Sequence, residues 1–351
     1  MKTYLLLLFS FITLCSKGKD VNILDFGAIP DGKALSTGAI QKAIDQCTVT
    51  GGGTVTVPVG TFLTNTIFLK SNVNLLIQKG AIILGNTDPK AFNGALVLAD
   101  NIQNASITGL GIINGQGFKK DYPTNGPRHN NILLLKSKNI TIQDVTLINS
   151  SSWVFRIREC DGVIVKGIRI YSFSNENNDG IDIDGKNITI SDCIIDCDDD
   201  GMCLKSDNPD FLVENVAISN CVIGSNCNAI KFGTSSSCGF KNVSISNCVI
   251  RRPSEAAHRN WSRSIQGVSN DTTVISGIAL EVVDGGAMDQ VAITNISMTG
   301  IQTPLFIRLG SRKGTGSLKN IIISNIIATN ESMITSSITG IPGSYVENVI
   351  P

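Results

Sequence analysis

One strand pattern recurs along this chain at nearly constant spacing. The stretch Asn-Ile-Thr-Ile from Asn139 returns in closely similar form from Gly162, Asn187, Asn215 and Asn242, so successive starts lie 23, 25, 28 and 27 residues apart. Each copy alternates β-branched residues with small polar ones, which is typical of a half-buried strand. A period in the twenties indicates a solenoid, in which every coil buries its apolar face only against neighbouring coils.

Further copies of the pattern begin at Thr272, Gln290 and Asn320. Helical patterns are scarce after residue 50, so we expect an all-β chain folded as a right-handed parallel β-helix rather than a leucine-rich horseshoe. A solenoid grows by adding coils, so residues 21–351 are expected to form a single domain. Another strand should begin at Asn348, next to the last residue of the sequence, and we expect the sequence to be truncated or to lack its final coils.

Residues 21–60 differ from the repeats. The stretch from Ser36 to Cys47 places apolar residues at helical spacing, with Ser36 or Thr37 available as the N-cap. Gly51-Gly-Gly ends this helix, and the strands begin at Thr54. The first coil of a β-helix would otherwise expose its backbone groups and core to water, so we expect this amphipathic helix to be an N-terminal cap.

The N-terminus is expected to stand apart from the fold. Leu5–Leu14 is an apolar run too short to span a bilayer, and it follows a single lysine. We interpret residues 1–18 as a signal peptide, which predicts a secreted, periplasmic or cell-surface protein. Ile12–Cys15 also loosely resembles a lipoprotein cleavage site, which would add an outer-membrane lipid anchor at Cys15, although Leu14 stands where a small residue is usual.

Ten cysteines in an exported chain would suggest disulfides, but their positions argue otherwise. Cys193, Cys221 and Cys248 occupy the same position in three consecutive repeats, which predicts a ladder of stacked, buried thiols. The others are scattered and no spacing suggests zinc, so one disulfide among them stays open. Most of the Asn-x-Ser/Thr triplets also share one repeat position, which indicates turn chemistry rather than glycosylation.

The balance of charge excludes several kinds of partner. Lysine and arginine together number 29, as do aspartate and glutamate, so the chain has neither the basic surface of a nucleic-acid-binding protein nor a polybasic membrane patch. Aromatic residues make up 5% of the chain, which argues against a base-stacking surface. We expect no nucleic-acid partner, and we expect the protein to act as a monomer.

Two acidic clusters, the NNDGID that begins at Asn177 and the DDD that ends at Asp200, fall on successive repeats. Asp199 and Asp200 lie 12 and 13 residues after the start of their repeat. Cys227 and Asn228 lie at the same two offsets in the next repeat, so these positions should stack on adjacent coils.

Asp179 lies 17 residues after the start of its own repeat at Gly162, and the extra residues are expected to bulge at the turn. Coils of a β-helix lie about 4.8 Å apart, so carboxylates on adjacent coils can flank a glycosidic oxygen. Inverting glycosidases need their acid and base about 6.5–9.5 Å apart. Clustered carboxylates also repel one another, which raises one pKa enough to hold the proton of a general acid.

Short motifs along the chain follow a familiar order. The N-terminal ones are LDFGAIPDG from Leu24, AIQKAI from Ala39, GGGTV from Gly51 and LKSNV from Leu69. NNDGID from Asn177 and DDGMCLKS from Asp199 follow them. Together they resemble glycoside hydrolase family 28, the polygalacturonase family, over roughly residues 22–350, with Asn178 in the Thr position of the N-T-D motif.

The resemblance implies a hydrolase that cleaves an α-linked, pectin-related or other plant or algal polysaccharide by inversion, with no cofactor and no metal. It implies that Asp199 is the general acid and that Asp179 with Asp200 activates the attacking water. Asn177 is expected to contact the substrate. The neighbouring acids interpreted as turn residues or supports are Asp182, Asp184 and Asp198.

Three positions depart from the family pattern. Asn228 stands where the family has the histidine of G-H-G, and Ala279 and Glu281 stand where it has the arginine and lysine of R-I-K. These cations are expected to hold the uronate carboxylate, so their loss argues against homogalacturonan, and Glu281 without a compensating cation would repel an acidic sugar. New cations could come from Lys205, Lys231, Arg308 or Arg312. The predicted substrate-binding residues are thus Asn177, Asn228, Lys231, Lys205, Glu281 and Arg308.

Two other interpretations stay open. In a β-helical polysaccharide lyase, the three acids would bind calcium and a basic residue such as Lys205 would abstract a proton. In a carbohydrate-binding or adhesive β-helix, the departures from the family would mark a decayed site. The segment Arg251–Arg263 breaks the repeat, and we expect either a wall of the cleft or an exposed loop there. His129 could border the cleft, and His258 is expected in a surface loop.

Overall fold

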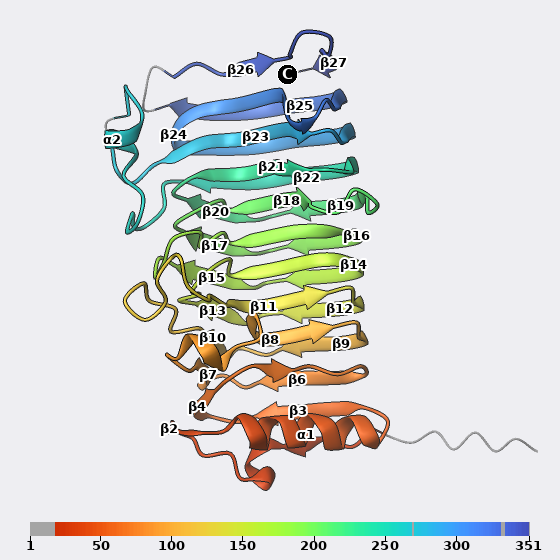
Figure 1. Cartoon of the computed structure of the whole chain (residues 1–351), viewed down its shortest axis with the longest axis vertical. Helices are drawn as coiled ribbons and strands as arrows, with labels where there is room; N and C mark the ends of the chain where they lie inside the picture. The colour runs from red at the N-terminus through yellow and green to blue at the C-terminus, as the bar shows by residue number, and fades with distance from the viewer. Residues whose placement is uncertain (1–17, 269, 331–333, 351) are drawn as a thin grey trace, which may run out of the picture.

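The structure is a computed structural model that describes residues 18–268, 270–330 and 334–350. In this part of the chain, parallel strands stack coil upon coil along one long axis (Figure 1). The predicted all-β parallel β-helix is confirmed. Apart from Gly18, the predicted signal peptide lies outside the described residues, as does Cys15.

The strands form three parallel sheets, and each complete coil passes through the first, second and third sheet in turn. The strands confined to the first sheet are β1 (Val21–Asn22), β3 (Gly53–Val57), β6 (Val73–Ile77), β9 (Gln103–Thr108), β12 (Lys138–Gln143), β19 (Val213–Ser219) and β27 (Val346–Ile350). Those confined to the second sheet are β2 (Asp31–Leu35), β4 (Gly60–Thr64), β7 (Ala81–Gly85), β10 (Ile112–Asn114), β13 (Thr146–Ile148), β15 (Arg169–Ser172), β17 (Ile194–Cys197) and β20 (Val222–Ser225).

Those confined to the third sheet are β5 (Ile67–Phe68), β8 (Ala95–Asp100), β11 (Asn130–Leu135), β18 (Met202–Ser206), β21 (Asn228–Ser236), β23 (Val274–Asp284) and β26 (Ser337–Thr339). Longer strands bend round a corner and join two or three sheets, namely β14 (Phe155–Lys166), β16 (Ile181–Ser191), β22 (Gly239–Arg251), β24 (Ala287–Gly314) and β25 (Ser317–Asn330). The helical elements are η1 (Ile23–Phe26), α1 (Thr37–Val49), η2 (Pro89–Ala91) and α2 (Trp261–Ser264).

Inward-facing residues of successive coils stack into one core. In the first sheet, Ile188, Val216 and Val243 are in register on three coils, and each is at most 2% exposed. Full burial of such a side chain stabilises the fold by about 1.5–3 kcal/mol. The core therefore grows with every repeat, as the alternating pattern predicts.

Asparagines in the left-handed conformation turn the chain into the first sheet. Asn187, Asn215 and Asn242 have φ angles of 54°, 58° and 53°, which asparagine tolerates better than most residues. The Nδ2 group of Asn215 donates to Oδ1 of Asn187 at 3.0 Å, and that of Asn242 donates to Oδ1 of Asn215 at 2.8 Å. The predicted role of these asparagines in turns is confirmed.

The residue before each of these corners alternates in charge from coil to coil. The first-sheet register aligns, in order, Lys138, Asp161, Lys186, Glu214, Lys241, Asp289, Lys319 and Glu347. The ammonium of Lys186 lies 3.0 Å from Oε1 of Glu214. Like charges directly opposite each other destabilise a sheet, so this charge ladder favours the native register.

Helix α1 lies across the first coil (Figure 1), and its buried face consists of Ile40, Ala43, Ile44 and Cys47. The predicted N-terminal cap is confirmed. Ser36 stands at the N-cap position, but its hydroxyl bonds with the backbone of Ile29 instead of the first helical turn. After the helix, Gly52 has φ +106°, and a Cβ there would lie 2.3 Å from the carbonyl oxygen of Asn72, so this position requires glycine.

One predicted copy of the repeat is wrong. The strand that follows Thr272 belongs to the third sheet, where Ile278 pairs with Ile230, and not to the first. The chain returns to the first sheet only near Gln290, because an insertion lengthens this coil. The strand predicted at Asn348 is present as β27.

The predicted cysteine ladder is confirmed. Cys193, Cys221 and Cys248 are buried on successive coils, and each thiol donates to the carbonyl two residues earlier at 3.2–3.3 Å. All nine cysteines in the described part of the chain are free thiols, so the disulfide that the sequence left open does not form there. Within the same residues, no helix has the length and apolar character needed to cross a membrane.

Candidate active site

The three predicted catalytic acids, Asp179, Asp199 and Asp200, lie in the turns that lead from the second sheet into the third. The strand register places Asp179, Asp200 and Asn228 in one row on three successive coils. Asp199 precedes this row by one residue and lies next to Cys227 of the coil above. The stacking expected from the repeat offsets is therefore confirmed. The expected spacing is not met, because a carboxylate oxygen of Asp199 lies within 4.8 Å of one of Asp200, closer than the separation of about 6.5–9.5 Å expected between an inverting acid and base.

Local sequence explains why the coils approach so closely here. A Cβ on Gly180 would lie 2.5 Å from the carbonyl oxygen of Gly201, so no larger residue fits at this position. Asn178 is fully buried and holds the turn that carries Asp179. It hydrogen-bonds to Ser150, Ser152, Ser172, Ser174 and Asn175.

Asp200 is held as an anion by its neighbours. Its Oδ2 accepts from the ammonium of Lys231 at 2.9 Å, and its Oδ1 accepts from Nδ2 of Asn228 at 2.7 Å. Burial alone would raise the pKa of Asp200, but Lys231, Lys205 and the bond from Asn228 outweigh it and lower that pKa below its usual value. Asn228 and Lys231, which the sequence predicts to bind substrate, therefore stabilise the charge of Asp200.

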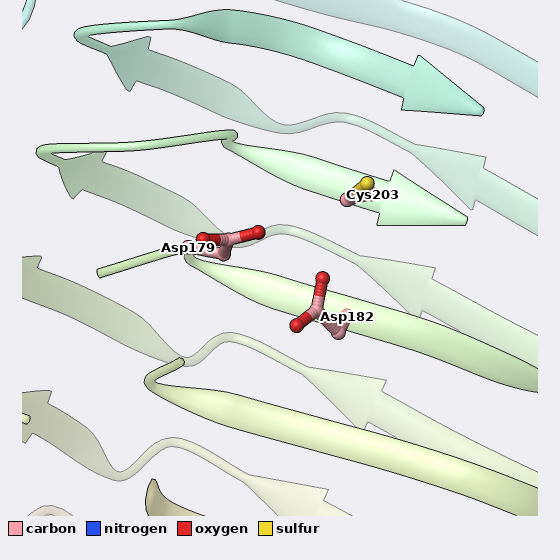
Figure 2. Close-up of side chains that lie close together, drawn as sticks. All are labelled: Asp179, Asp182 and Cys203. Atoms are coloured by element: carbon pink, nitrogen blue, oxygen red, sulfur yellow. The ribbon is translucent and has the colours of Figure 1, made fainter. Parts of the chain in front are cut away.

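Asp179 has the opposite environment. It lies beside Asp182 and Cys203 (Figure 2), and the ammonium of Lys205 is 3.5 Å from Asp179 Oδ2 and 3.6 Å from Asp182 Oδ1. The single ammonium group of Lys205 therefore lies near the carboxylates of both Asp179 and Asp182. Burial and then the charge of Asp182 raise the pKa of Asp179 well above its usual value, and burial also raises the pKa of Asp182. This pair therefore keeps its protons to a higher pH than Asp200 does.

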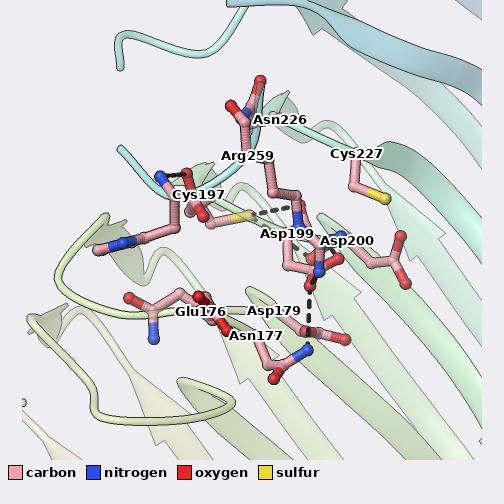
Figure 3. Close-up of polar contacts among 12 residues, drawn as sticks. Glu176, Asn177, Asp179, Cys197, Asp199, Asp200, Asn226, Cys227 and Arg259 are labelled. Atoms are coloured by element: carbon pink, nitrogen blue, oxygen red, sulfur yellow. Dashed lines mark hydrogen bonds and ion pairs between the residues drawn. The ribbon is translucent and has the colours of Figure 1, made fainter. Parts of the chain in front are cut away.

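Asp199 contacts a cation from another part of the chain. Its Oδ2 pairs with the guanidinium of Arg259 and accepts from Nδ2 of Asn177 at 3.4 Å (Figure 3). Asn177 in turn accepts from Nη2 of Arg128 at 3.2 Å. The sequence interpretation misses Arg128, which lies in no motif, and Arg259. The insertion that carries Arg259 forms a wall of the site, which is one of the two alternatives that the break in the repeat at Arg251–Arg263 predicts.

The premise that Glu281 has no compensating cation is wrong. Its Oε2 accepts from Nε of Arg308 at 2.7 Å, and its Oε1 lies 3.8 Å from the ammonium of Lys231. Arg312 instead donates to Asp284 at 2.7 Å. An acidic sugar near Glu281 would therefore meet a neutralised carboxylate rather than a bare one, and the sequence-based reason for rejecting polygalacturonate does not hold.

The remaining predicted residues, Asp198, Asp184 and His129, are buried in the structure around the site. Asp198 accepts two backbone N–H groups of the insertion, one of them from His258 at 3.4 Å. Asp184 is buried, and burial raises its pKa to about 7. His129 is also buried, stacks on Phe92 and has its pKa lowered to about 4 by burial, so it does not border the cleft.

These residues fit a calcium ion poorly. Two sets of side chains could converge on one ion, Asp179–Asp182–Cys203 and Asp199–Asp200–Cys227. Each set contains a thiol, which is a softer ligand than calcium prefers. A lysine or arginine already contacts every carboxylate of both sets. The calcium-dependent lyase interpretation therefore gains no support from the donor set.

Parallel coils stacked in this way, with a row of acids in their turns, make the protein a parallel β-helix with a candidate acid–base site. Residues 20–250 match the family described as rhamnogalacturonase A/epimerase, pectate lyase-like. The chain belongs to this family, and the relationship predicted from its motifs is confirmed.

Individual relatives agree with this assignment. A probable polygalacturonase of Vitis vinifera is 29% identical over 226 residues, covering 56% of this chain and 46% of that protein. Rhamnogalacturonase A of Aspergillus niger is 26% identical over 218 residues, covering 59% of this chain and 47% of that protein. The chain thus spans about half the length of the curated relatives it matches.

A solved structure agrees in fold. The exopolygalacturonase of Thermotoga maritima matches with a TM-score of 0.80 at 23% identity, over 95% of this chain and 86% of that one. This likeness extends the shared β-helix beyond the residues that the family match covers.

Proposed function

We propose that this protein is a glycoside hydrolase that cleaves an acidic pectic polysaccharide, and that it inverts the anomeric configuration, as its resemblance to glycoside hydrolase family 28 implies. The observation that carries the proposal is that two carboxylates on adjacent coils, Asp179 and Asp200, have opposite pKa shifts. Lys231 keeps Asp200 ionised despite its burial, whereas burial raises the pKa of Asp179. A buried carboxylate that stays ionised is suited to act as a general base, and the raised pKa of Asp179 leaves Asp200 as the base of this row. The family and the names of the relatives support a pectic substrate.

In the proposed reaction, Asp199 donates a proton to the glycosidic oxygen as the bond to the anomeric carbon breaks. A water molecule attacks the opposite face of the sugar, and ionised Asp200 takes the proton that this water loses. Asp179 orients the water. The products are two shorter chains, one with inverted configuration at its new reducing end, and solvent returns the proton from Asp200 to Asp199.

The charges of the site suit an anionic sugar. Lysines or arginines contact five acids of the site, but Asp179 and Asp182 have raised pKa values because they are buried, so these two contribute less negative charge than their number suggests. Four cations contact the acids, namely Lys205, Lys231, Arg259 and Arg308. A site with this balance does not repel a polyuronate as a bare acidic cluster would.

We further propose that the protein is exported and acts as a secreted, periplasmic or cell-surface enzyme. The apolar run Leu5–Leu14 supports a signal peptide over residues 1–18. A polymeric substrate also favours hydrolysis outside the cell. Fractionation of cells that express the full chain tests this, and recovery of the protein only from the cytoplasm with residues 1–18 intact would contradict it.

Release of reducing ends from polygalacturonan and rhamnogalacturonan tests the proposed activity. The wild-type protein should cleave at least one of the two polymers, and Asp200→Asn should lower the rate about 10²–10⁴-fold. Asp210→Asn, an exposed position between β18 and β19, is the matched control and should keep the wild-type rate. No cleavage of either polymer by the wild type, or equal rates for it and Asp200→Asn, would contradict the proposal.

A further inference from the structure

An insertion between β22 and β23 folds down over the acidic turn. The buried carboxylates of Asp196 and Asp198 accept hydrogen bonds from backbone N–H groups of the insertion. The carbonyl of Asn226 accepts from the indole of Trp261. These contacts hold residues 252–264 of the insertion in place, so that Arg259 forms an ion pair with Asp199 (Figure 3).

The contact between Arg259 and Asp199 opposes the proposed role of Asp199. A carboxylate that pairs with a guanidinium stays ionised and has no proton to give to a leaving oxygen. Asp200, the next residue, lies beside Asp199 (Figure 3), and its ionised carboxylate opposes a second negative charge at Asp199. Arg259 is therefore the group that must move before Asp199 can act as an acid.

The guanidinium of Arg259 has an N–H donor that is not paired with an acceptor among the described residues. Its Nη2 pairs with Asp199, whereas its Nε is buried and has no hydrogen-bond acceptor among the described residues. The side chain is 27% exposed and its guanidinium lies 5.5 Å from the ring of Trp261, but Nε itself is buried, so a ligand reaches this donor only when the guanidinium turns away from Asp199. A planar guanidinium with an unused donor is suited to bind a second carboxylate in a bidentate manner.

We propose that Arg259 binds the carboxylate of a uronate residue next to the scissile bond, and that this exchange releases Asp199 to take up the catalytic proton. The proposal rests on the hydrolase function proposed above. A neutral sugar cannot make the exchange, so Asp199 stays paired and cleavage is slow. Arg259 thereby couples recognition of an acidic sugar to the protonation of the general acid.

Binding tests the site without requiring turnover. The variants are Arg259→Gln, Arg259→Lys and, as matched control, Arg263→Gln, which alters an exposed arginine of the same insertion. The probes are trigalacturonate and its fully methyl-esterified form, with affinity measured by calorimetry. Arg259→Gln should weaken binding of trigalacturonate about tenfold or more and change binding of the ester less than about twofold. Arg259→Lys should recover part of the loss, and Arg263→Gln should bind as the wild type does.

Turnover gives a second readout that a structural role would not produce. Arg259→Gln should lower kcat/KM for trigalacturonate but leave or raise it for the methyl ester, because Asp199 is no longer held ionised. An equal loss on both probes would show that Arg259 merely supports the structure, and an equal gain would show that it merely blocks Asp199. Either result overturns the proposal.

The two proposals fail in distinguishable ways. If the wild type binds trigalacturonate in a manner that depends on Arg259 but cleaves neither probe, the hydrolase function is wrong and the Arg259 site stands. If the wild type cleaves trigalacturonate and Arg259→Gln binds it equally well, the Arg259 site is wrong and the hydrolase function stands. A wild type that does not bind trigalacturonate overturns the Arg259 site as well.

Discussion

The ammonium of Lys231 lies 2.9 Å from Oδ2 of Asp200, one coil below it. Their side chains are 13% and 4% exposed, so solvent screens this ion pair little. Burial alone would raise the pKa of Asp200, yet the pKa is lowered because Lys231, Lys205 and Asn228 stabilise the carboxylate. Asp200 is therefore ionised under conditions in which its buried neighbour Asp179 still holds a proton.

Replacing Lys231 with methionine should move the acidic limb of the pH profile of kcat/KM to higher pH by about one to three units. Asp200 works in its ionised form, so without Lys231 it takes up a proton at higher pH, and activity is lost earlier as the pH falls. A series of initial rates across pH measures this. Lys166→Met, at an exposed lysine, is the control, and an acidic limb that stays in place in Lys231→Met would refute this role of Lys231.

Asp199→Asn should lower kcat at least about 100-fold while the melting temperature changes little and substrate binding is retained. The amide keeps the shape of the carboxyl group and an oxygen for Arg259, but it has no proton to deliver. Initial rates, thermal unfolding and binding are compared with those of Asp210→Asn. Near-normal turnover in Asp199→Asn would remove this residue from the role of general acid.

Buried His129 should make the protein less stable as the pH falls from about 6.5 to 4. Burial lowers its pKa to about 4, whereas the unfolded chain has the ordinary value of about 6.5, so in this window the unfolded chain binds a proton that the folded protein does not. Across the window, the wild type should lose on the order of 3 kcal/mol more than His129→Gln in the free energy of unfolding by urea.

His258→Gln, at the other histidine, is the control for this comparison and should keep the wild-type loss. If the wild type and His129→Gln lose stability in parallel as the pH falls, exclusion of a proton from His129 does not contribute.

Reversing one charge of the first-sheet ladder should destabilise the protein. Lys186→Glu places an acid between Asp161 and Glu214 and should lower the free energy of unfolding by about 1 kcal/mol at low salt, and by less at high salt. Lys166→Glu, on the same sheet opposite Gln143 and Ser191, should change little. Urea unfolding at two salt concentrations measures both, and equal effects of the two substitutions would show that the alternation of charge is irrelevant to stability.

Much of the fold and half of the site follow from the repeat, because the offset of a residue from the start of its repeat fixes its place on a coil. This is why the stack of Asp200 on Asn228 and the cysteine ladder could be predicted. Arg259 could not be placed on Asp199, since the insertion follows no repeat. The pairing of Glu281 with Arg308 depends on the directions of two side chains on adjacent coils, which a sequence period does not specify.

Proton NMR of a pectic digest tests the central claim most directly. The polymer is polygalacturonan or rhamnogalacturonan, whichever the protein cleaves faster, and spectra are recorded from the first minutes of the reaction. We predict that the first new signals come from β-anomeric reducing ends, because inversion at an α-linked sugar gives the β anomer before mutarotation. An α anomer appearing first would show retention, and an olefinic sugar proton would show elimination, and either result would contradict hydrolysis by Asp199 and Asp200 as proposed.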